Sequence, residues 1–143
     1  DKRLSLLQGS YLAGIVQMNA GSGIAAAISY PLGVHYSVPH GIGGGMFCLG
    51  VARWNCLNGF DKYKNLKNII PEDVETSIEV VDYLEQLFAD IGVPNKLTKF
   101  GIKKENLNHL VEIMQPMQLA CDQNPIKFSV DSDFKDFIID YLE

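Results

Sequence analysis

The chain has 143 residues, a net charge of -5 at pH 7, and 47% hydrophobic residues. This length and composition suit a single domain that can bury a core of its own. The negative charge argues against nucleic acid and against an anionic membrane surface as partners. The densest basic group, Lys62, Lys64 and Lys67, is expected to be a solvated face.

Three cysteines, Cys48, Cys56 and Cys121, leave an odd number without C-x-x-C spacing. This pattern is typical of a reducing compartment, so we expect a cytoplasmic protein whose thiols serve as small apolar residues. Polar residues interrupt every apolar stretch, so neither a membrane span nor a signal peptide is expected. An amphipathic pattern is already under way at Leu4, which suggests that an N-terminal part of a longer protein precedes Asp1.

Apolar residues recur at helical spacing along almost the whole chain. Only residues 126–130 show a weak strand-like alternation. The predicted fold class is therefore all-α, a helical bundle. Within it, we expect Arg53 and Asn55 to face outward, and Ser132 with Asp133 to cap the last helix. The expected helices are residues 2–19, a short buried helix 24–29, 41–58, a helix from Pro71 that stops at Gly92, 103–114 and 132–142.

The stretch from Tyr30 to Met46, Y-P-L-G-V-H-Y-S-V-P-H-G-I-G-G-G-M, contains two of the three histidines. We expect it to be a loop, because Pro31 disfavours continuation of the preceding helix and Gly33 can supply a positive φ. It is expected to place His40 at the first turn of the next helix.

The glycines from Gly41 to Gly45 leave this turn almost without side chains, so another group can approach the backbone. A histidine held there can bind a metal or act as an acid or base. Two simpler interpretations stay open: His40 caps the helix or satisfies a buried carbonyl, and the glycines serve close helix packing.

The frame P-L-G-x-x-Y-x-x-P-H-G, within Ser29 to Gly41, resembles the C-terminal helical domain of the iron-containing (group III) alcohol dehydrogenases. These enzymes are related in fold to dehydroquinate synthase and glycerol dehydrogenase. Five further segments follow the family's order along the whole chain: the opening helix that ends in A-G-I-V-Q-M-N-A-G, the helix before L-F-A-D-I-G-V-P, the Phe100-Gly101-Ile102 step, the Asn124-Pro125 turn and the closing helix.

The resemblance implies that residues 1–143 are the C-terminal, all-helical metal and substrate domain of a dehydroquinate synthase-like enzyme with two domains. A Rossmann-like domain that binds NAD or NADP would precede it, and the active site would lie in the cleft between them. The chain alone would be inactive, because the dinucleotide-binding half is absent.

By the same resemblance, an aspartate and three histidines hold a divalent metal, iron or zinc. One of these histidines matches His40, another falls at Ala26, and the remaining two ligands would precede Asp1. A further family histidine, close to the substrate, falls at Tyr30. Alanine cannot ligate a metal, so binding is expected to be weak, with water or His35 filling the gap, or to be lost. The candidate residues are His40 for the metal, and Tyr30 and His35 for catalysis.

Three functions remain open at this stage. The first is a metal-assisted, NAD(P)-dependent alcohol dehydrogenase that oxidises an alcohol or reduces an aldehyde or ketone. The second is a specialised branch that acts on a sugar or polyol with an altered or lost metal site. The third is a helical binding or assembly domain without chemistry. Expected partners are a small alcohol or carbonyl substrate and the N-terminal domain; a homo-oligomer is left open.

Overall fold

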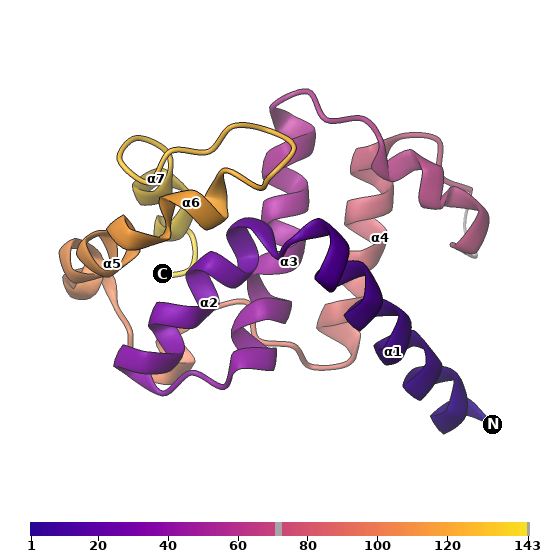
Figure 1. Ribbon diagram of the computed structural model, residues 1–143, viewed down its shortest axis with the longest axis horizontal. Coiled ribbons are helices and arrows are strands. Elements are labelled where there is room, and N and C mark those ends of the chain that lie inside the picture. The colour runs from indigo at the N-terminus through magenta and orange to yellow at the C-terminus, as the bar shows by residue number, and fades with distance from the viewer. Residues whose placement is uncertain (71–72, 143) are drawn as a thin grey trace.

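A computed structural model describes residues 1–70 and 73–142. In this part of the chain every regular element is helical, which confirms the all-α class (Figure 1). Residues 126–130, the one segment with strand-like alternation, are irregular. The elements are α1 (Lys2–Ala20), α2 (Gly23–Tyr36), α3 (His40–Leu57), η1 (Tyr63–Ile69), α4 (Ser77–Asp90), η2 (Leu97–Phe100), η3 (Lys104–Asn106), α5 (Leu107–Met114), η4 (Gln115–Met117), α6 (Gln118–Cys121) and α7 (Phe134–Ile139), where η marks a 3₁₀ helix.

The core lies around α2 and α3, which cross at the centre of the molecule (Figure 1). α5, α6 and α7 cover one side of this pair, and α4 lies on the other (Figure 1). The largest fully buried side chains come from α2, α3, α4, α5, α7 and the segments that connect them: Phe47, Phe128, Phe134, Ile24, Ile28, Leu32, Leu97, Ile102, Leu110, Met114, Ile138 and Val80.

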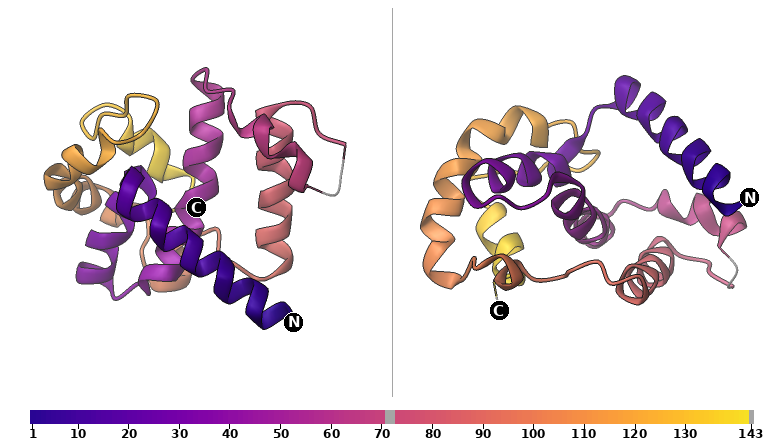
Figure 2. Two further views of the ribbon diagram at one scale, coloured as in Figure 1. Left: turned by 45° about the vertical axis from the view of Figure 1, so that its right-hand side comes forward. Right: turned by 90° about the horizontal axis from the view of Figure 1, so that it is seen from below.

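α1 projects away from this core with the N-terminus at its tip (Figures 1 and 2). None of its residues is buried. Just after the C-terminal end of α1, the backbone N–H of Ser22 donates to Oε1 of Gln123 over 3.2 Å, which joins this end to the rest of the domain. The helix nevertheless carries a row of large apolar side chains, all exposed: Leu4, Leu6, Leu7, Tyr11, Leu12, Ile15, Val16 and Met18.

Among the described residues no single helix is long and apolar enough to cross a membrane. α1 and α2 together meet that length and composition, but they are bent by 101° at the break between them.

The sequence prediction that Pro31 ends a helix is wrong. α2 runs through Pro31 to Tyr36, so Tyr30 to Met46 forms helix, turn and helix rather than a loop. Proline removes one helical N–H donor, and the burial of Pro31 and Leu32 in the core offsets that loss. The positive φ expected at Gly33 lies instead at Ser37, with φ 56°.

The turn after α2 is closed by two N–H groups, those of Ser37 and Val38, that donate to the carbonyl of Leu32. A Cβ at Gly33 would lie 3.4 Å from the Val38 carbonyl oxygen, an ordinary van der Waals contact, so these two hydrogen bonds rather than Gly33 close the turn. The chain therefore turns back tightly enough to start α3 at His40.

α4 and α7 are shorter than predicted. α4 begins at Ser77, after a capping box in which Thr76 and Glu79 exchange hydrogen bonds; Asp73 lies outside the helix, and the rest of the predicted first turn, residues 71–72, lies outside the described residues. The expected stop at Gly92 is confirmed by its φ of 78°. Before α7, Asp133 accepts from the N–H of Ser129 over 2.8 Å instead of capping the helix.

Asn55 was predicted to face outward, but it is 1% exposed. Its side chain exchanges two hydrogen bonds with Asn124, of 3.2 and 2.6 Å, and its Nδ2 also donates to the Tyr63 hydroxyl over 3.0 Å. A buried amide is stable when its donors and acceptors are paired in this way. Asn55 therefore ties the Asn124-Pro125 turn to the end of α3.

The C-terminal residues complete the core. Phe134, Ile138 and Leu142 are each at most 3% exposed. The carbonyl of Tyr141 accepts from the N–H of Leu97 over 2.8 Å, which fastens the end of the chain to η2.

The α2–α3 contact predicts opposite effects for two neighbouring glycines. A Cβ at Gly43 would lie 3.1 Å from Cβ of Ser29, whereas a Cβ at Gly44 would meet nothing within 4 Å. Gly43→Ala should therefore lower the free energy of unfolding by about 1 kcal/mol, since overpacking outweighs the gain in helix propensity. Gly44→Ala should raise it by about 0.5–1 kcal/mol. Urea unfolding followed by circular dichroism measures both; equal effects would contradict the close packing.

The cysteines predict a graded reactivity. Cys121 is 0% exposed, and its burial and the charge of Asp122 raise the pKa of its thiol to about 11. The thiol of an unfolded chain has a pKa of about 8.5, so the folded state should lose stability from this group as the pH rises from there towards 11. At pH near 8, a thiol reagent followed by mass spectrometry should modify exposed Cys48 first and Cys121 only at the rate of unfolding. Early modification of Cys121 would show that this part of the core opens easily.

Candidate functional site

The candidate site lies where α2 and the start of α3 face each other. Ser29 and Tyr30 are adjacent and lie about one turn after Ala26 on α2, and His40 is the first residue of α3. The fold thus brings His40 against the same helix on which the resemblance placed a ligand position, at Ala26, and a substrate position, at Tyr30.

Ser29 is the buried member of this group, at 1% exposure. Its Oγ lies 3.2 Å from Nδ1 of His40 and 3.1 Å from the carbonyl oxygen of Ala26, to which it donates. Because Gly43 has no side chain, α3 approaches Ser29 closely enough for this contact. The imidazole is therefore held from its Nδ1 side.

Tyr30 stacks on His40. The two ring centroids are 5.0 Å apart with an angle of 30° between the planes, and Tyr30 is 52% exposed. The predicted pair of Tyr30 and His40 thus lies side by side on an accessible surface, where a ligand can reach both.

His35 lies elsewhere. Its ring packs edge-on against His109, with centroids 5.4 Å apart, and the Tyr36 ring also contacts His109. Nδ1 of His109 lies 3.5 Å from Oε2 of Glu112. His35 is exposed near the end of α2, and its ring contacts are with His109 rather than with His40.

Two of the predicted glycines leave open space beside His40. A Cβ at Gly41 or Gly44 would meet no atom within 4 Å, and Gly44 lies one helical turn after His40. At Gly43, in contrast, Ser29 of α2 fills the space that a side chain would take. The glycine run therefore serves close packing at one position and leaves the helix surface bare at two others.

The metal ligands available from this chain are few. In the described ranges, 1–70 and 73–142, no three His, Cys, Asp or Glu side chains gather closely enough to hold a metal ion. Ala26 offers a methyl group at the position where the resemblance expects a ligand. His40 fits as one ligand, and further donors for a metal would have to come from outside these residues.

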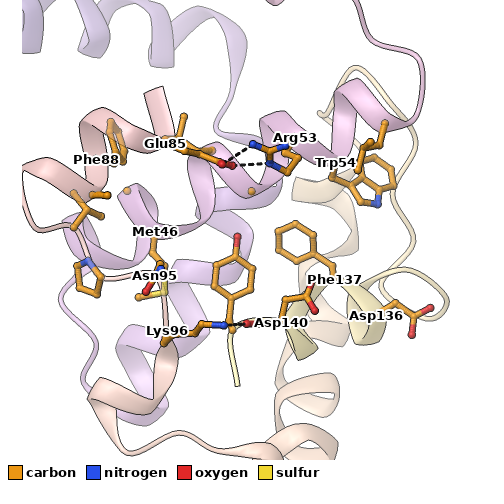
Figure 3. A pocket seen from close by; sticks show the side chains of 18 of the residues that line it. Met46, Arg53, Trp54, Glu85, Phe88, Asn95, Lys96, Asp136, Phe137 and Asp140 are labelled. Atoms are coloured by element: carbon orange, nitrogen blue, oxygen red, sulfur yellow. Dashed lines mark hydrogen bonds and ion pairs between the residues drawn. The ribbon is translucent and has the colours of Figure 1, made fainter. Parts of the chain in front are cut away.

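A cavity of about 570 Å³ lies between the C-terminal part of α3, α4, the segment 93–96 and α7 (Figure 3). Its lining includes neither Tyr30, His35 nor His40, so it is separate from the candidate site. The walls combine aromatic and apolar side chains with charged groups: Met46, Leu49, Trp54, Phe88, Phe137 and Tyr141 with Arg53, Glu85, Lys96, Asp136 and Asp140.

Charged pairs tie the walls of this cavity together. Arg53 donates to both carboxylate oxygens of Glu85, over 2.8 and 2.6 Å (Figure 3). It also donates to Asp82, so these bonds join α3 to α4. The hydrogen bond to Glu85 is the main cause that raises the pKa of Arg53 above its usual value. On the opposite wall, Nζ of Lys96 donates to the carbonyl of Asp140 over 2.7 Å.

Residues 1–134 match the C-terminal region of the Fe-containing alcohol dehydrogenase family. The chain belongs to this family. It is 31% identical over 132 residues to long-chain-alcohol dehydrogenase 1 of Geobacillus thermodenitrificans (strain NG80-2), a match that covers 87% of the chain and 33% of that protein. Lactaldehyde reductase of Escherichia coli (strain K12) is 30% identical over 110 residues, covering 73% of the chain and 29% of that protein.

The fold of this iron-type alcohol dehydrogenase domain also matches a solved structure of 1,3-propanediol oxidoreductase. The TM-score is 0.68 at 21% identity, over 80% of this chain and 31% of that one. The chain thus spans about a third of the length of the relatives that it matches. Both findings confirm the resemblance that the P-L-G and P-H-G frame carried.

Sequence reasoning missed two residues of this family member. Ser29 lay inside the recognised frame, but a serine inside a helix gives no signal of the imidazole that it contacts. Arg53 was expected to be solvated, and its partners, Asp82 and Glu85, lie 29 and 32 residues further on. The signal that could have suggested these ion pairs was the spacing of Asp82 and Glu85, which are one helical turn apart on the following helix.

The Arg53 pairs predict how strongly α4 is held. Arg53→Gln should lower the free energy of unfolding by about 0.5–1 kcal/mol, because partly exposed pairs that form a network contribute in that range. Lys64→Gln, which removes a single exposed pair with Asp61, is the matched control and should change little. Thermal melts at low and high salt would test this, since the deficit of Arg53→Gln should shrink as salt screens the pairs. A deficit that persists in high salt would assign the effect to packing instead.

Proposed function

We propose that this chain is the C-terminal domain of an NAD(P)-dependent, metal-assisted alcohol dehydrogenase that oxidises an alcohol or reduces an aldehyde or ketone. One observation carries the proposal: in a member of the iron-type family, His40 is held at the start of α3 by its Nδ1 side, beside an exposed Tyr30. The names of the relatives, which include an alcohol dehydrogenase and an aldehyde reductase, support the reaction class.

In this function His40 is a ligand of a divalent metal, iron or zinc, through Nε2, the ring nitrogen that Ser29 leaves free. A bound metal of this kind acts as a Lewis acid that polarises the substrate oxygen. Ala26 contributes no ligand, so the remaining donors belong to the preceding part of the protein.

Tyr30 is positioned to contact the substrate. Its ring shields one face of His40 and its side chain is half exposed. The bare helix surface at Gly41 and Gly44 gives substrate or cofactor access to the same region. His35 keeps its predicted catalytic role only if the complete protein changes its present contact with His109.

The expected partner is an N-terminal, Rossmann-like domain that binds NAD or NADP. Two observations support such a partner. α1 carries a row of exposed apolar side chains, and this chain spans only about a third of the length of its relatives. Without it the chain should show no dehydrogenase activity. A cytoplasmic location remains the expectation drawn from the cysteine pattern.

Ala26 favours one alternative. A branch of the family that acts on a sugar or polyol and binds metal weakly or not at all would also place alanine at a ligand position. In that case Tyr30 and His40 would act by hydrogen bonding and proton transfer alone.

The metal content of the complete protein tests the two functions. With its N-terminal domain joined to this chain and anaerobic purification, the protein should carry close to one iron or zinc per chain by elemental analysis, and His40→Ala should lose most of it. His109→Ala is the control, because His109 pairs with Glu112 away from the site, and should keep the metal. Metal-free protein in every case would reject metal assistance and favour the alternative.

A further inference from the structure

The contact between Ser29 and His40 determines which nitrogen of the imidazole carries the proton. A serine hydroxyl has one hydrogen to donate, and a neutral imidazole has one N–H and one accepting nitrogen. Oγ of Ser29 is within hydrogen-bond distance of two groups, the carbonyl oxygen of Ala26 at 3.1 Å and Nδ1 of His40 at 3.2 Å. The carbonyl can only accept.

One arrangement satisfies both contacts. Ser29 donates its hydrogen to the Ala26 carbonyl, and Nδ1–H of His40 donates to Oγ. In the reverse arrangement, Ser29 donates to Nδ1, and its oxygen then faces the Ala26 carbonyl without a hydrogen between them. Ser29 is 1% exposed, so water does not readily relieve that contact.

We propose that Ser29 is a positioning residue that fixes His40 in the tautomer protonated at Nδ1 and so keeps Nε2 unprotonated. The lone pair of Nε2 is the group that a metal needs from a neutral imidazole, and it is equally the group that accepts a proton in a metal-free reaction. Ser29 thus prepares His40 for either chemistry.

The packing around Ser29 supports this role. The backbone of α3 comes close to Ser29 at Gly43, where a Cβ, if present, would lie 3.1 Å from Cβ of Ser29. α2 and α3 hold both partners, since Ser29 lies inside α2 and His40 starts α3. The stacked Tyr30 ring further restricts rotation of the imidazole. The hydrogen bond therefore joins two rigid elements rather than two mobile side chains.

Nitrogen NMR of the imidazole tests the tautomer directly on this chain. Two-bond ¹H–¹⁵N correlation spectra distinguish the protonated from the unprotonated nitrogen. They are recorded at about pH 9, where histidine rings are ordinarily neutral. Signals of His40 are assigned by their loss in His40→Gln. We expect Nδ1 of His40 to be the protonated nitrogen. A protonated Nε2 as the main form would overturn the proposal.

Ser29→Ala keeps the Cβ that packs against Gly43 and removes only the hydroxyl. The ratio of the Nδ1–H to the Nε2–H form of His40 should then fall by about threefold to tenfold, the range expected for one neutral hydrogen bond. Ser5→Ala is the matched control, since Ser5 is another helix serine that donates to a backbone carbonyl, that of Asp1; it should leave the ratio unchanged. An unchanged ratio in Ser29→Ala, with the melting curve of the wild type, would contradict the positioning role.

The consequence for catalysis rests on the function proposed above, whereas the tautomer does not. If the complete protein carries no metal but His40 is protonated at Nδ1, the metal function fails and the role of Ser29 stands. If metal is bound but His40 is protonated at Nε2 in the free protein, the role of Ser29 fails instead.

Discussion

Close approach of α2 and α3 at Gly43 and Ser29 is the constraint on which the candidate site depends. The two helices meet where one of them lacks a side chain, and a Cβ at Gly43 would lie only 3.1 Å from Cβ of Ser29. This contact orders the turn between Tyr36 and His40 and brings an imidazole over a buried hydroxyl. Phe47, one turn after Gly43 on α3, is 0% exposed and lies in the core.

Most of the fold could be predicted from the spacing of apolar residues, because an amphipathic helix is a local property of the sequence. α1, α3 and α5 were placed within a few residues of their bounds, apart from the 3₁₀ turn that begins α5. The helix boundary at Pro31 was mispredicted because the local cost of a proline in a helix follows from the sequence. The burial in the core that offsets this cost depends on tertiary packing. Asn55 was misjudged for a similar reason, since its partner Asn124 lies far away in the sequence.

The candidate site could be predicted in part. The P-H-G frame identified His40, and the structure adds that Tyr30 stacks on it. The hydrogen bond between Ser29 and His40 could not be predicted from the sequence, because it depends on how α3 folds back over α2. His35, five residues before His40, shows the opposite case: nearness in sequence did not bring the two rings together, because His35 lies on α2 against His109 of α5, whereas His40 follows the turn and starts α3. These contacts depend on the path of the backbone.

The packing of residues 134–142 has a consequence for how the domain forms during synthesis. Phe134, Ile138 and Leu142 fill the core, and the Tyr141 carbonyl accepts the N–H of Leu97. A chain emerging from the ribosome can form α2 and α3 before residues 134–142 are made, but their apolar faces stay uncovered until those residues arrive. The domain therefore closes late, and a nascent chain halted before α7 would expose much of its core to chaperones.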